Sequence, residues 1–304
     1  MGKIVAIGAN VADVLVTLDN YPAEDTKMKA KSLVHAGGGP AATGLCAASV
    51  LGADCSFIGN YTDDSDGLYL LNDFKKYGVA NDNLTLISGC RSFSSQIWLS
   101  EKDKTRTCVF DKGTIPPLVL SNSQKSAVAN SDILLVDGNE ILAAVEAATI
   151  AKANGVTILY DAGGLYDGVE QLLPLCDILI PSKEFALNIT NENNVEIAIK
   201  TLYNKYMPKV VVVTCGKDGG VMFDGENMIY YPIYPANVVD SNGAGDVFHG
   251  AFCVALTKKY SYCDCCNYAS AASALKCEKL GARSAVPSHE KVLELLKSNN
   301  YFIK

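Results

Sequence analysis

The stretch DSNGAGDVFHGAFCVAL, residues 240–256, joins a glycine-rich turn to an apolar helical run. The apolar run predicts a helix, and the glycines of the turn lie at its N-terminus. Unpaired N–H groups and the positive end of the helix dipole converge there. Glycine has no side chain to block a close approach. The stretch therefore predicts a phosphate site facing the N–H groups of Ala244, Gly245 and Asp246.

Asp246 adds chemistry to this turn because it falls in the first turn of the predicted helix. A carboxylate beside a bound phosphoryl group can take a proton from a hydroxyl while the N–H groups stabilise the transferring charge. The pattern therefore favours phosphoryl transfer to an alcohol. The alternative is a tight turn followed by an ordinary first-turn aspartate, since short glycine-rich motifs recur by chance.

Outward from this stretch, short apolar runs alternate with helical patterns along most of the chain. The predicted strands are residues 4–7, 55–58, 133–136, 157–160, 178–180 and 210–213. The predicted helices are residues 41–51, 69–77, 141–153 and 195–205. Alternation of this kind predicts parallel strands joined by crossover helices that cover both faces of one sheet. The fold class is α/β.

Two extended segments, residues 14–35 and 91–110, interrupt the alternation and have no crossover helix of their own. We expect them to form a small β-sheet lid over a site. The main α/β domain would then comprise residues 1–13, 36–90 and 111–304. Trp98, in the second segment, is interpreted as part of the lid core rather than as a platform for a sugar ring.

Composition limits the classes of partner. The 304 residues include 26 basic and 33 acidic side chains, a net charge of −7, which disfavours nucleic acid and anionic membranes as partners. The chain shows neither a signal-peptide pattern nor an apolar run of about 20 residues, so we expect a cytoplasmic protein. Eleven cysteines fit free thiols in a reducing compartment. Cys263-Asp264-Cys265-Cys266 suggests either a metal site or, as we favour, ordinary thiols at a helix start.

The order of the motifs resembles the ribokinase-like, or PfkB, carbohydrate kinases. Residues 240–246 resemble the family's Asp-Thr-x-Gly-Ala-Gly-Asp signature, and residues 213–220 its Thr-x-Gly-x-x-Gly nucleotide turn. Gly8, Asp13 and the Gly-Gly turn within residues 36–42 match its N-terminal sugar-binding landmarks. The resemblance covers nearly the whole chain. It implies a three-layer α/β/α sandwich with a mostly parallel central sheet and a small β-sheet lid.

The resemblance also implies roles for individual residues. Asp246 would be the catalytic base, and the anion hole for the γ-phosphate would consist of Gly243, Ala244 and Gly245. The implied sugar contacts are Asp13, Asn10, Gly37, Gly38 and Gly39. The implied nucleotide contacts are Thr214, Gly216, Gly219, Ala274, Cys277 and Gly281. His249, one turn after Asp246, is interpreted as a packed helix residue.

The cofactors implied are ATP and Mg²⁺, with K⁺ in many relatives. The family's Asn-x-x-Glu motif appears as Ser182-Lys183-Glu184-Phe185, so Glu184 is a displaced candidate for organising Mg²⁺. Asp240 and Asn242 are the candidates for a monovalent-cation site. Ala42 stands where the family usually has asparagine, which removes one polar group near the sugar.

Within the family, the motifs are most similar to members of the sulfofructose kinase and fructokinase type. Lys27 stands where such enzymes have an anion-contacting lysine, and Arg91 is a further candidate contact. Lys27, Lys29 and Lys31 would share one face of a lid strand, pointing either into the site or outward along a sheet edge. Gly138 and Asn139, however, stand where a sulfonate-binding arginine would be expected.

The sequence therefore predicts an ATP-dependent kinase that phosphorylates a primary hydroxyl of a neutral or differently substituted ketose of the fructose type. A kinase of a phosphorylated or sulfonated ketose, a nucleoside kinase, and a sugar or nucleotide sensor without turnover are the alternatives. The resemblance further implies a homodimer formed through the lid.

Overall fold

The apolar runs predicted as strands form one large sheet in the computed structural model, which describes residues 2–103 and 105–304. Over those residues the strand order is β13-β12-β11-β10-β9-β8-β1-β4-β5. The parallel strands are β1 (Lys3–Ile7), β4 (Asp54–Thr62), β5 (Leu84–Ile87), β8 (Ile133–Val136), β9 (Thr157–Ala162), β10 (Ile178–Pro181) and β11 (Val210–Thr214). Antiparallel strands β12 (Gly220–Phe223) and β13 (Met228–Tyr231) complete one edge.

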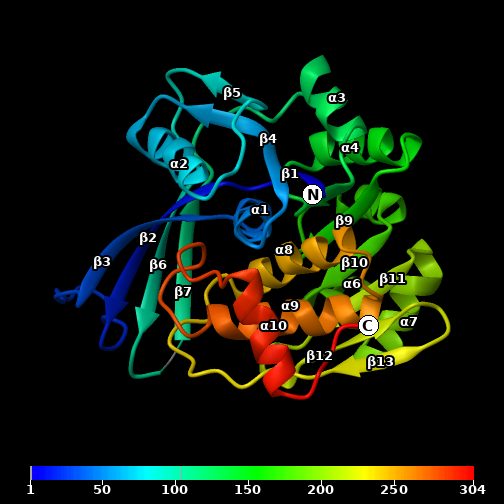
Figure 1. Cartoon of the computed structure of the whole chain (residues 1–304). Coiled ribbons are helices and arrows are strands. Elements are labelled where there is room, and N and C mark those ends of the chain that lie inside the picture. The colour runs from blue at the N-terminus through cyan, green and yellow to red at the C-terminus, as the bar shows by residue number, and fades with distance from the viewer. Residues whose placement is uncertain (1, 104) are drawn as a thin grey trace.

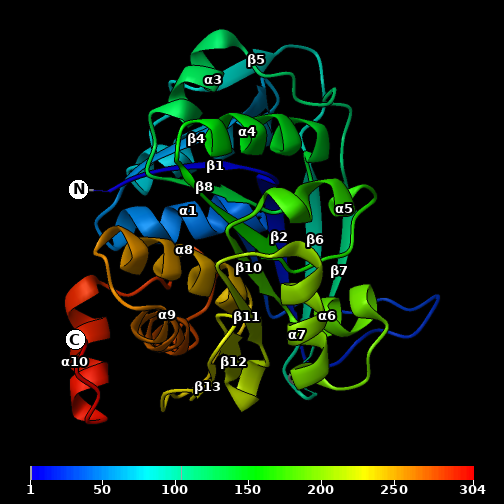
Figure 2. The ribbon, with the colours of Figure 1, turned by 90° about the vertical axis from the view of Figure 1, so that its right-hand side faces the viewer.

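Helices cover both faces of this sheet, as Figure 2 shows. One face packs against α1 (Pro40–Val50), α2 (Ser65–Lys76), α8 (Ala244–Thr257), α9 (Tyr262–Lys276) and α10 (His289–Ser298). The other packs against α3 (Asn122–Ala129), α4 (Ile141–Ala153), α5 (Val169–Leu172), α6 (Lys183–Thr190) and α7 (Val195–Tyr206). Strands buried on both faces read as continuous apolar runs, as in β8, where all four residues are buried. The predicted α/β fold is confirmed.

A second sheet projects from this body (Figure 1) and has the order β3-β2-β6-β7. It is called the lid sheet and consists of β2 (Val11–Leu18), β3 (Ser32–Gly38), β6 (Ser94–Ser100) and β7 (Thr105–Asp111). Strands β2 and β3 extend beyond the predicted segment because their pairing continues to Val11 and Gly38. The division of the chain into lid and main domain at residues 14–35 and 91–110 stays a prediction.

Side chains alternate between the two faces of the lid sheet. One face lines a cavity and carries Asp13, Ser95, Ile97, Cys108 and Phe110. The outer face carries Val14, Val16, Leu33, Trp98 and Val109. Trp98 therefore points away from the cavity.

The three lysines before β3 do not lie on a strand, so that prediction is wrong. Strand β3 begins at Ser32, opposite Thr17, and β2 ends one residue later, so Lys27, Lys29 and Lys31 belong to the connection between the strands. The Lys31 ammonium forms ion pairs with Asp19 (2.5 Å) and Glu101 (2.6 Å) at the surface. Lysines at every second position resemble the pattern of a strand, but the pairing of β2 with β3 does not extend to this segment.

The cysteines are all free thiols. Over residues 2–103 and 105–304, no group of three or more His, Cys, Asp and Glu side chains is arranged to hold a metal ion. Cys265 and Cys266 are buried in α9, and the interpretation of residues 263–266 as ordinary thiols stays a prediction. Among the same residues, none of the helices has the length and apolar character needed to cross a membrane.

Candidate active site

The glycine-rich turn lies at the start of α8, as predicted. Gly243 is the N-cap residue and has a φ of 75°, a left-handed conformation that favours glycine. A Cβ on Gly243 would also lie 2.4 Å from the Cβ of Ala282. The first N–H groups of α8 are therefore presented by a turn that tolerates no side chain at its cap. The turn stands between two cavities.

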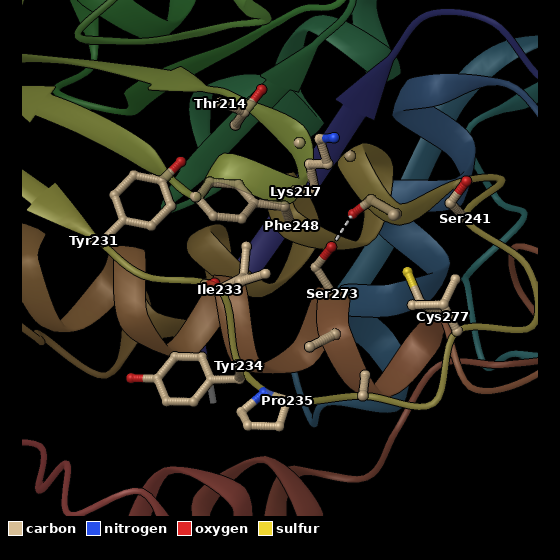
Figure 3. A pocket seen from close by; sticks show the side chains of 18 residues that line it. Thr214, Lys217, Tyr231, Ile233, Tyr234, Pro235, Ser241, Phe248, Ser273 and Cys277 are labelled. Carbon is tan, nitrogen blue, oxygen red and sulfur yellow. Dashed lines mark hydrogen bonds between the residues drawn. The ribbon is translucent and has the colours of Figure 1, made fainter.

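The first of these, called the α9 cavity, has a volume of about 710 Å³. Figure 3 shows side chains from the turn after β11, from α8 and from α9 arranged around it. Of the predicted nucleotide contacts, it is lined by Thr214, Gly216, Gly219, Ala274 and Cys277. Ala244 and Gly245 line it as well, and the Ser273 hydroxyl donates a hydrogen bond to the Ala244 carbonyl (2.8 Å).

Much of this wall was not predicted. Aromatic and aliphatic side chains from the end of β13, from the segment after it and from α8 line the α9 cavity, together with one lysine among the described residues. They are Lys217, Tyr231, Ile233, Tyr234, Pro235 and Phe248. Apolar walls with a few polar groups are typical of pockets for a flat organic ring. The sequence signal for Tyr231, Ile233, Tyr234 and Pro235 was their position between the two recognised motifs, whereas Lys217 lies inside the first motif and Phe248 just after the second.

The second cavity, called the lid cavity, has a volume of about 320 Å³. It brings early and late parts of the chain together, since Asp13, Gly38 and Gly39 line it opposite Asn242 and Asp246. Its other polar lining residues are Thr43, Ser95, Lys112, Asn139 and Tyr166. Two carboxylates separated by more than 230 positions in the sequence thus face one small cavity beside the helix start.

Asp13 is buried at the base of the lid sheet. Ser95 donates a hydrogen bond to its Oδ1 (2.6 Å). Burial raises the pKa of Asp13, whereas the Ser95 hydroxyl and the charge of Arg283 act in the opposite direction. A Cβ on Gly38 would lie 1.9 Å from Asp13 Oδ2. The glycine is therefore required because the carboxylate occupies that space.

Arg283, which sequence reasoning missed, holds the glycine turn from behind. Its buried guanidinium donates hydrogen bonds to Asp73 Oδ2 (2.7 Å), Asn10 Oδ1 (2.8 Å) and the Gly38 carbonyl (2.5 Å). The predicted sugar contact Asn10 therefore uses its side-chain oxygen on this arginine. Gly37 packs against the same group, since a Cβ there would lie 2.3 Å from the guanidinium. A single arginine 210 residues from its acidic partner leaves no local pattern to find.

Asp246 lies on the cavity side of α8. Burial raises the pKa of its carboxyl, while His249 and Arg106 act in the opposite direction. Arg106 belongs to β7 and shares the cavity-facing side of the lid sheet with Cys108 and Phe110. A carboxyl whose pKa lies above the usual range is a stronger proton acceptor once ionised.

His249 is buried one turn below Asp246. Its ring nitrogens lie 2.6 Å from the Gly245 carbonyl and 3.0 Å from the Ile180 carbonyl. Asp161 Oδ2 lies 3.1 Å from the first of these nitrogens. Burial lowers the pKa of His249, and the two carbonyls act in the opposite direction. The ring joins α8 to β10, which agrees with its interpretation as a packed helix residue.

Eight of the predicted site residues line neither the α9 cavity nor the lid cavity; they are Asn10, Lys27, Gly37, Arg91, Glu184, Asp240, Gly243 and Gly281. Lys27 is exposed in the β2–β3 connection, and Arg91 pairs with Asp111 (2.7 Å) at the surface. Glu184 is exposed in the first turn of α6. The Gly281 N–H donates to Asp240 Oδ2 (2.8 Å) rather than facing the α9 cavity.

Comparison with known proteins supports the family resemblance that the motifs indicate. A family model described as pfkB family carbohydrate kinase matches residues 1–289. The ribokinase of Staphylococcus aureus (strain COL) is 27% identical over 305 residues, which cover 95% of this chain and 98% of that protein. The bifunctional ribokinase/ribose-5-phosphate isomerase A of Fructilactobacillus sanfranciscensis is 26% identical over 309 residues, 98% of this chain but only 57% of that longer protein.

Among solved structures, that of Arabidopsis thaliana ribokinase complexed with ribose and ATP is similar with a TM-score of 0.86 and 27% identity. The similarity covers 97% of this chain and 98% of that one. The resemblance predicted from the motifs is thus confirmed over almost the whole length.

Proposed function

The chain belongs to the pfkB family of carbohydrate kinases and is an ATP-dependent sugar kinase; on that premise we propose that its acceptor is a primary hydroxyl of a ketose of the fructose type. One observation carries the assignment of roles. Asp13 and Asp246 line the same cavity, while Ala244 and Gly245, adjacent to Asp246, line the other.

In the proposed reaction, ATP occupies the α9 cavity with its terminal phosphate at the start of α8. The N–H groups of the turn stabilise the charge of the transferring phosphoryl group. Asp13 holds the sugar hydroxyls, since a carboxylate can accept from two neighbouring hydroxyls. Asp246 takes the proton of the attacking hydroxyl. Cys108 and Phe110 of the lid sheet give that side of the lid cavity an apolar surface for the sugar to pack against.

Mg²⁺ supplies charge neutralisation on the ATP phosphates in this class of reaction. Such ions are held by phosphate oxygens and one or two carboxylates, with water completing the shell. Glu184, the candidate from the sequence, is exposed and lines neither cavity. Its side chain does not fit direct contact with the ion, and it takes no part in the proposed steps.

The charges around the lid cavity support an uncharged sugar. Of the described residues that line it, two are carboxylates, Asp13 and Asp246, and one is a cation, Lys112, while Arg106 lies on the same face of the lid sheet. A phosphate or sulfonate on the substrate would need further positive charge, and the candidates Lys27 and Arg91 lie elsewhere. Arginine is also missing after β8, where Gly138 and Asn139 follow Asp137.

A pentose is the second candidate, supported by similarity of 26 to 27% to ribokinases over almost the whole chain. A panel of D-fructose, D-tagatose, D-ribose, fructose 6-phosphate and adenosine, read as ADP release, separates the candidates. We expect the highest kcat/KM with a free ketose. A tenfold preference for ribose would replace the ketose by a pentose, and a preference for adenosine would assign a nucleoside kinase.

Asp246→Asn tests the proposed base. We expect turnover to fall by about 10²–10⁴ fold, the usual contribution of general base catalysis, with little change in sugar affinity. Near-normal turnover in this variant would refute the role. A wild-type chain that binds ATP and sugar but releases no ADP would instead indicate a sensor.

We also infer a homodimer formed through the outer face of the lid sheet. Leu33 is 65% exposed and Val109 62% exposed, and they flank Val16 and Trp98 on that face. A second copy of the chain can cover this apolar face by the same face of its own lid. Light scattering should give twice the monomer mass for the wild type and for Leu142→Asp, an exposed site on α4. Leu33→Asp should give monomers, and an unchanged dimer would contradict the inference.

A further inference from the structure

Lys276, the last residue of α9, is a lysine with no exposed side-chain surface. Its ammonium donates a hydrogen bond to the Asp240 carbonyl (2.7 Å) and lies 3.8 Å from Asp240 Oδ2. Lysine is almost never fully buried unless its charge is paired. The end of α9 also places the ammonium at the negative pole of that helix. The charge is therefore held in place by specific acceptors.

Asp240 connects this ammonium to the phosphate turn. Its carboxylate accepts from the Asn242 N–H through Oδ1 (2.8 Å) and from the Gly281 N–H through Oδ2 (2.8 Å). Gly243, the cap of α8, follows one residue after Asn242. The cation, the carboxylate and the two amides thus tie the turn before α8 to the segment after α9.

Asp240 and Asn242 are also the residues that the family resemblance assigned to a monovalent metal ion. Such an ion would need oxygen atoms of Asp240 as ligands. The carbonyl already accepts from Lys276, and each carboxylate oxygen already accepts from a backbone amide. A second positive charge beside a buried ammonium is repelled strongly, because the surroundings screen charge poorly. The residues present do not fit a metal ion at this place.

We propose that the Lys276 ammonium is the fixed positive charge beneath the phosphate turn, so that nucleotide binding and phosphoryl transfer require no K⁺ or other monovalent metal ion. The inference rests on the proposed use of this turn for the ATP phosphates. Lysine carries the same single charge as K⁺, but it is part of the chain and cannot dissociate. The positioning of the turn is therefore independent of the ions in solution.

ADP binding measured by calorimetry tests this without any sugar. Buffers of equal ionic strength would contain K⁺, Na⁺ or tetramethylammonium as the only monovalent cation. We expect the Kd of the wild-type chain to agree within twofold in all three. Binding more than tenfold tighter in K⁺ would overturn the proposal. A chain that binds ADP equally in every buffer yet phosphorylates no sugar would refute the proposed function and leave this inference supported.

Lys276→Ala removes the charge and leaves space for an ion. We expect ADP binding at least tenfold weaker than wild type in tetramethylammonium, with part of the loss recovered in K⁺. Lys279→Ala, at an exposed lysine three residues on, should bind as the wild type does. Wild-type affinity of Lys276→Ala in every buffer would overturn the proposal. Circular dichroism checks folding, and if the variant does not fold, the wild-type measurement decides.

Discussion

Replacing Arg283 by methionine tests whether this residue supports the glycine turn at residues 37–39 without taking part in the reaction itself. The Arg283 side chain is 2% exposed and its partner Asp73 6% exposed, with 2.7 Å between the charged groups. Methionine retains most of the apolar stem but leaves the Asp73 carboxylate buried without its cation. Breaking a buried ion pair on one side costs about 3–5 kcal/mol. The Gly38 carbonyl also loses a donor, which adds about 1–3 kcal/mol.

Urea unfolding followed by circular dichroism measures this cost. A surface pair provides the matched control, since Arg91 and Asp111 also lie 2.7 Å apart but are 66% and 55% exposed. Arg91→Met should leave the free energy of unfolding close to that of the wild type, because exposed pairs contribute little to stability. The double variant Asp73→Leu/Arg283→Met should be more stable than Arg283→Met, because no uncompensated charge is left.

The kinetic result should follow the geometry. Arg283 contacts Asn10 and Gly38 and acts on the pKa of Asp13, but it does not line the α9 cavity. We therefore expect a higher KM for the sugar and little change in the KM for ATP. The reasoning would be refuted by Arg283→Met lying within about 1 kcal/mol of wild type, or by the double variant losing the sum of the single losses.

Three further substitutions and conditions have defined outcomes. Gly38→Ala would place a Cβ 1.9 Å from Asp13 Oδ2 and displace that carboxylate. The KM for the sugar should therefore rise at least about tenfold, which corresponds to about 1.4 kcal/mol. Steady-state kinetics measure this, and an unchanged KM would contradict the prediction. Burial raises the pKa of Asp246 above its ordinary value of 3.8, so its carboxyl stays protonated to higher pH. The value of kcat/KM should therefore rise as the pH increases through that raised pKa. A profile of kcat/KM that is flat down to pH 3.8 would argue against Asp246 as the base. Arg106→Gln removes a charge that lowers the pKa of Asp246, so the acid limb of the same profile should move to higher pH, whereas Thr107→Ala on the outer face should leave it in place.

The central sheet was predictable because burial on both faces leaves a simple pattern. Strand β11 contains four consecutive valines, and the structure buries all of them. The glycine-rich turn at a helix start was equally readable, since the glycines and the following apolar run occur together in the chain. Both signals come from residues that are close together in the sequence, so they can be recognised without knowledge of tertiary contacts.

The supporting contacts were not predictable, because they join distant residues. Arg283 meets Asp73 across 210 positions, and Lys276 meets Asp240 across 36. In the sequence, Arg283, Asp73 and Lys276 look like ordinary surface charges. The lysine at position 27 was wrongly predicted to lie on a lid strand. Residues at every second position indicate a strand only where a neighbouring strand is available to pair with them.

The connection between the two sheets has a consequence for wasteful hydrolysis. Strand β1 ends at Ile7 and β2 begins at Val11, so Asp13 stands on the lid sheet, whereas Asp246 stands on α8. The carboxylate proposed to grip the acceptor and the one proposed to deprotonate it thus belong to different sheets or layers. Only a molecule long enough to contact both carboxylates can link the lid sheet to α8. A water molecule offers a single oxygen atom, so we expect an arrangement that binds a sugar at both carboxylates to favour transfer to the sugar over hydrolysis of ATP.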